Sequence, residues 1–124
     1  MELNPDKDLA IDIGDLTNEF KEFSLLMYRY SVQRAKIEAQ RDLAKAKLKE
    51  VRAMVFKRIK ADSSVKHTEK SLEAEIDTDP EAKQALIGYI QAEHNATTWA
   101  GAVDSMRSKL NCLIQLGSDR RKEM

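Results

Sequence analysis

The stretch FKEFSLLMYRYSVQRAKIEAQRDLAKAKLKEVRAMV, residues 20–55, places apolar or long side chains at alternating steps of three and four residues. Because an α-helix turns once every 3.6 residues, this spacing collects those side chains along one face of a single helix. Gly14 and Asp15 precede the stretch and are typical of a chain break followed by a helix N-cap. The pattern predicts one helix over residues 16–60. Its inner face would carry Phe20, Phe23, Met27, Tyr30, Arg34, Ile37, Arg41, Ala44, Leu48, Val51 and Val55.

A second long helix is predicted downstream of the sequence DTDPE, residues 77–81. Asp79 is suited to the N-cap, Pro80 to the first helical position, and Glu81 to the positive end of the helix dipole. Thr68 is a candidate cap for a short helix that ends near Asp77. The same spacing then continues to an expected end at Gly117. The inner face of this helix would carry Ala82, Ala85, Tyr89, Ala92, Ala96, Trp99, Val103, Met106, Leu110 and Leu113.

The expected fold is therefore all-α, with two long antiparallel helices plus short helices. Residues 1–14 form an acidic N-terminal lead or short helix, and residues 15–124 form a helical hairpin domain. The chain of 124 residues has the length of one domain, and Cys112 is its only cysteine. Nothing resembles a signal peptide, and no apolar run reaches the roughly 20 residues of a membrane span. We expect a soluble protein of a reducing cytoplasm.

Each long helix also carries a second apolar row, which a two-helix pair cannot cover. A helix of about 45 residues is about 68 Å long, too long for a compact monomer. We therefore expect an obligate homo-oligomer that buries these rows in coiled-coil-like seams between copies. The rows are Leu16, Leu26 and Leu43 on the first helix, and Leu86, Ile90, Ala100 and Ile114 on the second.

Catalytic chemistry finds little support in the sequence, and we expect no enzyme, no metal and no cofactor. His67 and His94 lack the spacing that builds a metal site on a helix face, and both are expected at the surface. Cys112 lies next to Leu113 on the apolar side of the second helix, where we expect it to be a small buried side chain. The four glycines form no phosphate-binding loop.

Charge is strongly segregated along a chain whose net charge is zero. Residues 29–60 hold eleven Lys or Arg and three Asp or Glu, whereas residues 61–98 hold three basic and eight acidic residues. Along the first helix, Arg41, Lys45, Lys49, Arg52 and Lys60 fall in one stripe with Phe56 among them, and Lys47 is expected beside it. Such a stripe can follow phosphates, and an aromatic ring can stack on a base. The predicted DNA-binding residues are Arg41, Lys45, Lys47, Lys49, Arg52 and Phe56.

Two other interpretations of the stripe stay open. It can be the solvated face of a long helix, on which Asp42 and Glu50 reduce the repulsion between the cations. It can also pair with the acidic 61–98 segment of a neighbouring copy, in a coiled-coil or chaperone-like oligomer without a nucleic-acid role. Salt-dependent binding to oligo(dT) separates that last interpretation from DNA binding.

Several short motifs resemble the UvsY recombination mediators of T-even and related phages. IEAQ, residues 37–40, is followed by KAKL, residues 45–48, where that family has a basic Lys-Ala-Arg-Leu motif. Ile11 and Asp12 resemble the start of the family's sequence, which is acidic. GAVDSMRSKLNCLIQL, residues 101–116, resembles its final helix. The similarity spans most of the chain through short motifs in the same order.

The resemblance implies a protein that forms a heptamer-like ring and binds single-stranded DNA in the cytoplasm of a phage-infected cell. It would weaken the grip of the single-strand-binding protein and load a RecA-type recombinase, without chemistry of its own. Lys45 and Lys47 match the family's DNA-contacting cations. KAKL lies one residue closer to IEAQ than in the family, which makes Lys49 a third candidate.

Overall fold

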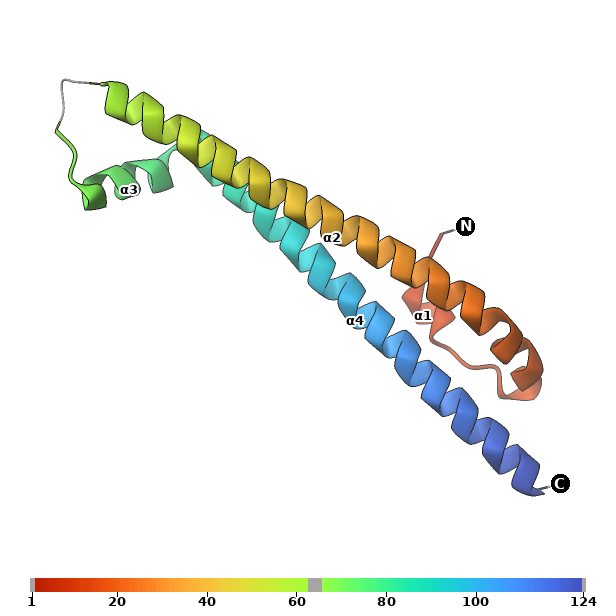
Figure 1. Ribbon diagram of the computed structural model, residues 1–124. Helices are drawn as coiled ribbons and strands as arrows, with labels where there is room; N and C mark the ends of the chain where they lie inside the picture. Colours follow the sequence, from red (N-terminus) through yellow and green to blue (C-terminus); the bar gives the residue numbers. More distant parts are fainter. Residues whose placement is uncertain (1, 63–65, 124) are drawn as a thin grey trace. The chain divides into compact units, whose positions relative to one another are not determined.

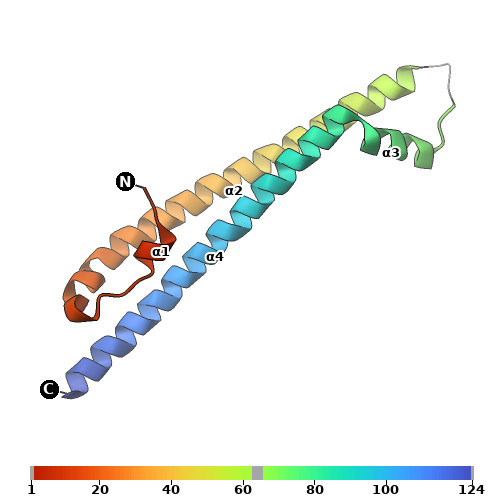
Figure 2. The ribbon, with the colours of Figure 1, turned by 180° about the vertical axis from the view of Figure 1, so that it is seen from behind.

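The computed structural model describes residues 2–62 and 66–123 (Figure 1). It is 90% helical, and the described residues include no strand, which confirms the all-α prediction. The elements are α1 (Pro5–Asp8), the 3₁₀ turn η1 (Ile13–Asp15), α2 (Leu16–Ala61), α3 (Glu69–Thr78) and α4 (Pro80–Glu123). The long helices α2 and α4 pack together, and they lie side by side in both views (Figure 1, Figure 2).

The predicted helix starts are confirmed by hydrogen bonds to the first backbone amides. The Asp15 carboxylate accepts the Asn18 amide at the start of α2. Thr68 and Ser71 form a reciprocal capping box at the start of α3. The Asp79 Oδ1 atom accepts the amides of Glu81 and Ala82 at the start of α4. These side chains satisfy amides that have no partner inside a helix.

The predicted end of α4 at Gly117 is wrong, because the helix continues to Glu123. A helix usually stops at glycine when that residue adopts a positive φ, and no described glycine does so. Gly117 instead packs beside Phe20, whose ring would lie 3.5 Å from a Cβ atom added there. That distance is an ordinary van der Waals contact, so Gly117 lies inside the helix beside the ring and does not end the helix.

The chain forms two compact units. The first unit contains the residues up to 36 and those from 96 onward, where α2 and α4 surround a core with Leu3, Leu9 and Ile11 packed against it. Leu16 belongs to this core, so its assignment to an uncovered outer row is wrong. Phe20, expected inside, is 39% exposed. The buried core residues are Leu16, Phe23, Tyr30, Val103, Met106 and Leu113.

Polar contacts hold the N-terminal segment onto the first unit. The Tyr30 hydroxyl donates to Asp8 Oδ2 at 2.8 Å, and the Lys109 ammonium donates to the Asp8 carbonyl at 2.6 Å. The Tyr30 ring also packs against partly buried Trp99, with ring centroids 5.8 Å apart, as expected for a seam residue. Burial, the hydrogen bond to Asp8 and the charge of that carboxylate raise the pKa of Tyr30.

The second unit, residues 37–95, has its own core. This core lies where α3 packs against the last turns of α2 and the first turn of α4. Val55, Leu72, Ile76 and Ala82 are buried there, with Val51 and Ile59 packed against them. The two buried residues of α3 are four apart, so this helix docks along one narrow apolar edge.

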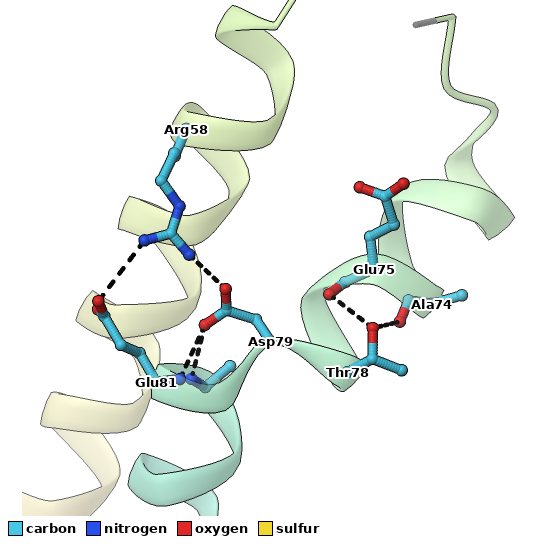
Figure 3. A network of polar contacts seen from close by, with 7 residues as sticks. Arg58, Ala74, Glu75, Thr78, Asp79 and Glu81 are labelled. Carbon is cyan, nitrogen blue, oxygen red and sulfur yellow. Dashed lines mark hydrogen bonds and ion pairs between the residues drawn. The ribbon is translucent and has the colours of Figure 1, made fainter.

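An arginine of α2 reinforces the start of α4 in the second unit (Figure 3). The Arg58 guanidinium donates to Asp79 Oδ2 and lies 3.5 Å from a Glu81 carboxylate oxygen. The Thr78 hydroxyl donates to the carbonyls of Ala74 and Glu75 at the end of α3. Asp79 therefore caps one helix and ties it to another.

The inner faces follow the predicted spacing closely. Every residue predicted for the inner face of α4 is buried or partly buried, and on α2 only Phe20 is exposed. Four members of the second apolar rows, Leu43, Leu86, Ile90 and Ile114, are exposed. Cys112 is exposed as well, so the prediction of a buried thiol is wrong. Within the part of the chain that the structure describes, no helix is long and apolar enough to cross a membrane.

Candidate nucleic-acid interface

Lys45 and Lys49 form the centre of the candidate interface, on α2 within the second unit. They are four residues apart, so they lie one turn apart on the same side of the helix. Both side chains are exposed, and neither forms an ion pair with a residue in the described ranges. Two cations are therefore free to meet an anionic ligand here.

Arg41 lies one turn before Lys45 and is partly engaged. Its guanidinium lies 3.2 Å from an Asp42 carboxylate oxygen, and about a third of the side chain is exposed. Arg41 also acts on Tyr89 of α4. Partial desolvation and the neighbouring Glu93 carboxylate raise the pKa of Tyr89, while the Arg41 charge opposes that rise.

Arg52 and Phe56 continue the stripe toward α3, where acidic side chains meet it. The Arg52 guanidinium lies 2.9 Å from Asp77 Oδ1. Arg52 and Phe56 line a shallow pocket with Glu69 and Glu73 of α3. The Lys60 ammonium lies 5.2 Å from the Phe56 ring centroid. At this end of the stripe, Arg52 thus already has a carboxylate partner and Phe56 already makes a cation–π contact.

Lys47 does not lie beside the stripe, and that part of the sequence prediction is wrong. Two residues of α-helix rotate a side chain by about 200°, which carries Lys47 away from Lys45. Lys47 lines a different pocket, together with Val51 of α2 and with Gln84 and Gly88 of α4. Of the six predicted DNA-binding residues, Arg41, Lys45, Lys49, Arg52 and Phe56 share one side of α2.

The acidic segment pairs with α2 of its own chain, and the sequence prediction named none of these partners. Asp77 binds Arg52, and Asp79 and Glu81 bind Arg58. The spacing held a signal for this arrangement, because the inner-face pattern continues from Val55 to Arg58 by a step of three. That step aims Arg58 at the start of the next long helix.

Neither histidine belongs to a candidate catalytic or metal site. His67 is largely buried, not at the surface as predicted, and its Nδ1 atom lies 3.8 Å from a Glu75 carboxylate oxygen. His94 is exposed, as predicted. Among the described residues, no group of three or more His, Cys, Asp or Glu side chains could hold a metal ion.

Comparisons with protein-family models, curated proteins and solved structures find no match to this chain. The resemblance to the UvsY mediators therefore stays a prediction. The exposed cations of α2 and their surroundings are the structural features that bear on function.

Proposed function

We propose that this protein binds single-stranded DNA without sequence preference along the stripe centred on Lys45 and Lys49. The observation that carries the proposal is the pair of exposed ammonium groups with no ion-pair partner in the described ranges. Ammonium groups attract phosphates as point charges and do not read base edges. Affinity should therefore depend on salt much more than on sequence.

The surroundings of the two lysines support a DNA contact of only a few phosphates for each chain. Arg41 adds a partly exposed side chain before Lys45, whereas Arg52 is shared with Asp77 after Lys49. One chain thus offers about two or three phosphate contacts. Because each contact on a single strand lowers the logarithm of affinity by about 0.7 per decade of salt, one chain alone would bind weakly. Several copies on one strand would raise the affinity by effective concentration.

We further propose that the protein acts as a recombination mediator. A strand held by an oligomer of this chain would be held less firmly by a single-strand-binding protein, because both compete for its phosphates. A RecA-type recombinase could then assemble on the strand. The resemblance of residues 37–48 and 101–116 to the UvsY family supports this step, as it supports the ring-shaped homo-oligomer.

A second candidate function is a coiled-coil assembly protein without a nucleic-acid role. Exposed apolar side chains on both long helices favour it, among them Leu43, Met54, Leu86 and Ile90. The ion pair of Arg52 with Asp77 also indicates that the acidic segment can neutralise part of the stripe. In this alternative, Lys45 and Lys49 would only keep the surface solvated.

A fluorescence anisotropy titration of labelled oligo(dT) at several salt concentrations separates the two functions. DNA binding predicts an affinity that falls steeply with salt and is similar for a mixed-sequence strand. Absence of binding at low salt, for a protein that still forms oligomers, would favour the assembly function. A filament assay with strand coated by single-strand-binding protein then tests recombinase loading.

A further inference from the structure

The outer side of α4 carries a short row of four side chains in the second unit: Lys83, Leu86, Ile90 and Glu93. They follow one another at steps of three, four and three residues, so they share one side of the helix. Leu86 is 43% exposed and Ile90 is 54% exposed. Lys83 and Glu93 are exposed at the two ends of the row. Two aliphatic side chains thus lie in water between a cation and an anion.

We propose that a second copy of this chain docks on this row, with the two α4 helices antiparallel. A two-fold axis near Gly88 would place Leu86 opposite Ile90 of the second copy. The same axis would place Lys83 opposite Glu93 of the second copy, and Glu93 opposite its Lys83. In this antiparallel arrangement each charged side chain faces one of opposite charge and each aliphatic side chain faces another aliphatic one. The row is therefore complementary to a second copy of itself, as a contact between identical surfaces requires.

The charges select the antiparallel arrangement and the identity of the occupant. In a parallel pair, Lys83 would face its own equivalent and Glu93 would face another Glu93, which costs affinity. An unrelated apolar helix would cover Leu86 and Ile90 but would match the flanking charges only by chance. A copy of α4 matches both charges and both aliphatic side chains at once.

Glu93 lies close to Tyr89 of the same helix. Partial desolvation and the Glu93 carboxylate raise the pKa of Tyr89, which is partly buried on the inner face of α4. A side chain that is restrained before binding loses less conformational freedom when its partner arrives. The exposed side chain of Lys83 would order on association.

The contact is small, since four residues a side bury less than the roughly 800 Å² per partner of a typical stable interface. It should therefore give a weak, concentration-dependent dimer. A contact between identical surfaces joins copies in pairs and does not by itself close a larger ring. The inference does not depend on DNA binding, and its tests use the protein without DNA.

Sedimentation velocity over a range of protein concentrations tests the aliphatic part of the row. We expect Ile90→Glu to abolish the concentration-dependent dimer, because the contact would have to bury a carboxylate beside an aliphatic side chain. Leu25→Glu is the matched control, since Leu25 is an exposed aliphatic residue on α2 that belongs to neither of the second apolar rows. A dimer that survives Ile90→Glu would overturn the proposal, as would a dimer that is lost in Leu25→Glu with its helicity intact, or a wild-type chain that never associates.

Charge reversal tests the antiparallel pairing. Lys83→Glu and Glu93→Lys should each weaken the dimer by about tenfold, because each turns two opposite-charge pairs into like-charge pairs. The double variant should associate like the wild type, and so should an equimolar mixture of the two single variants. A mixture of Lys57→Glu with Glu50→Lys, both off the row, controls for general attraction between oppositely charged chains. If the single variants associate like the wild type, or if the double variant stays weakened with its helicity intact, the pairing is wrong.

Discussion

The Lys109 Nζ atom lies 2.9 Å from Glu19 Oε2, and only 5% of the lysine side chain and 18% of the glutamate side chain are exposed. The same ammonium group donates to the Asp8 carbonyl. The Glu19 carboxylate also accepts the Asp12 amide through its other oxygen. One buried ion pair therefore joins α4, α2 and the N-terminal segment. Within residues 2–62 and 66–123, no buried side-chain nitrogen or oxygen lacks a hydrogen-bond partner.

Replacing the buried lysine should destabilise the protein. Lys109→Met keeps the length of the side chain but leaves the Glu19 carboxylate without its cation. Removing one member of a buried pair typically costs 3–5 kcal/mol, and the partial exposure of Glu19 lowers our expectation to about 2–3 kcal/mol. Urea unfolding followed by circular dichroism measures the change. Lys109→Met with Glu19→Gln should recover part of the loss, and an unchanged midpoint for the single variant would contradict the role of the pair.

The raised pKa of Tyr30 predicts a loss of stability at high pH. The folded state holds the phenol proton more tightly than the unfolded chain, whose tyrosines ionise near pH 10. The contribution is therefore complete below about pH 10 and is lost as the pH rises through the folded-state pKa. Tyr30→Phe should reduce the fall in unfolding free energy above pH 10. Parallel curves for wild type and variant would show that Tyr30 does not carry this dependence.

Asp79 should matter more as a helix cap than as an ion-pair partner. Asp79→Ala removes the acceptor for two amides at the start of α4 and leaves Arg58 with Glu81 alone. We expect a loss of about 1–2 kcal/mol, in the range typical of N-caps. Asp79→Asn is the matched control, because an amide oxygen still caps the helix while the charge is gone. Equal losses in both variants would assign the stabilisation to the charge instead.

Much of the fold could be predicted because spacing and capping act locally. The first long helix was expected over residues 16–60 and spans Leu16–Ala61, and Thr68 and Asp79 cap the next two helices as predicted. The all-α class followed from the same signals. Gly117 misled the prediction because a glycine ends a helix when it adopts a positive φ, and Gly117 keeps a helical conformation instead.

The candidate interface could be predicted only in part. Helix geometry alone groups Lys45 with Lys49 and separates both from Lys47. The partners of Arg52 and Arg58 depend on where α3 docks, which follows from burial of Leu72 and Ile76 and not from charge. The buried position of Lys109 was missed for a similar reason, since its partners come from a segment about 90–100 residues earlier in the chain.

Oligo(dT) anisotropy with matched lysine variants tests whether Lys45 and Lys49 form the DNA-binding site. We expect Lys45→Ala combined with Lys49→Ala to keep the helicity, since alanine favours helix, but to lower the affinity at low salt. The slope of log affinity against log salt should become shallower by about 0.7 for each lost phosphate contact. Lys47→Ala, on the other side of α2, should bind nearly as well as the wild type. If the double variant binds as tightly as the wild type with the same salt slope, Lys45 and Lys49 do not form the DNA-binding site.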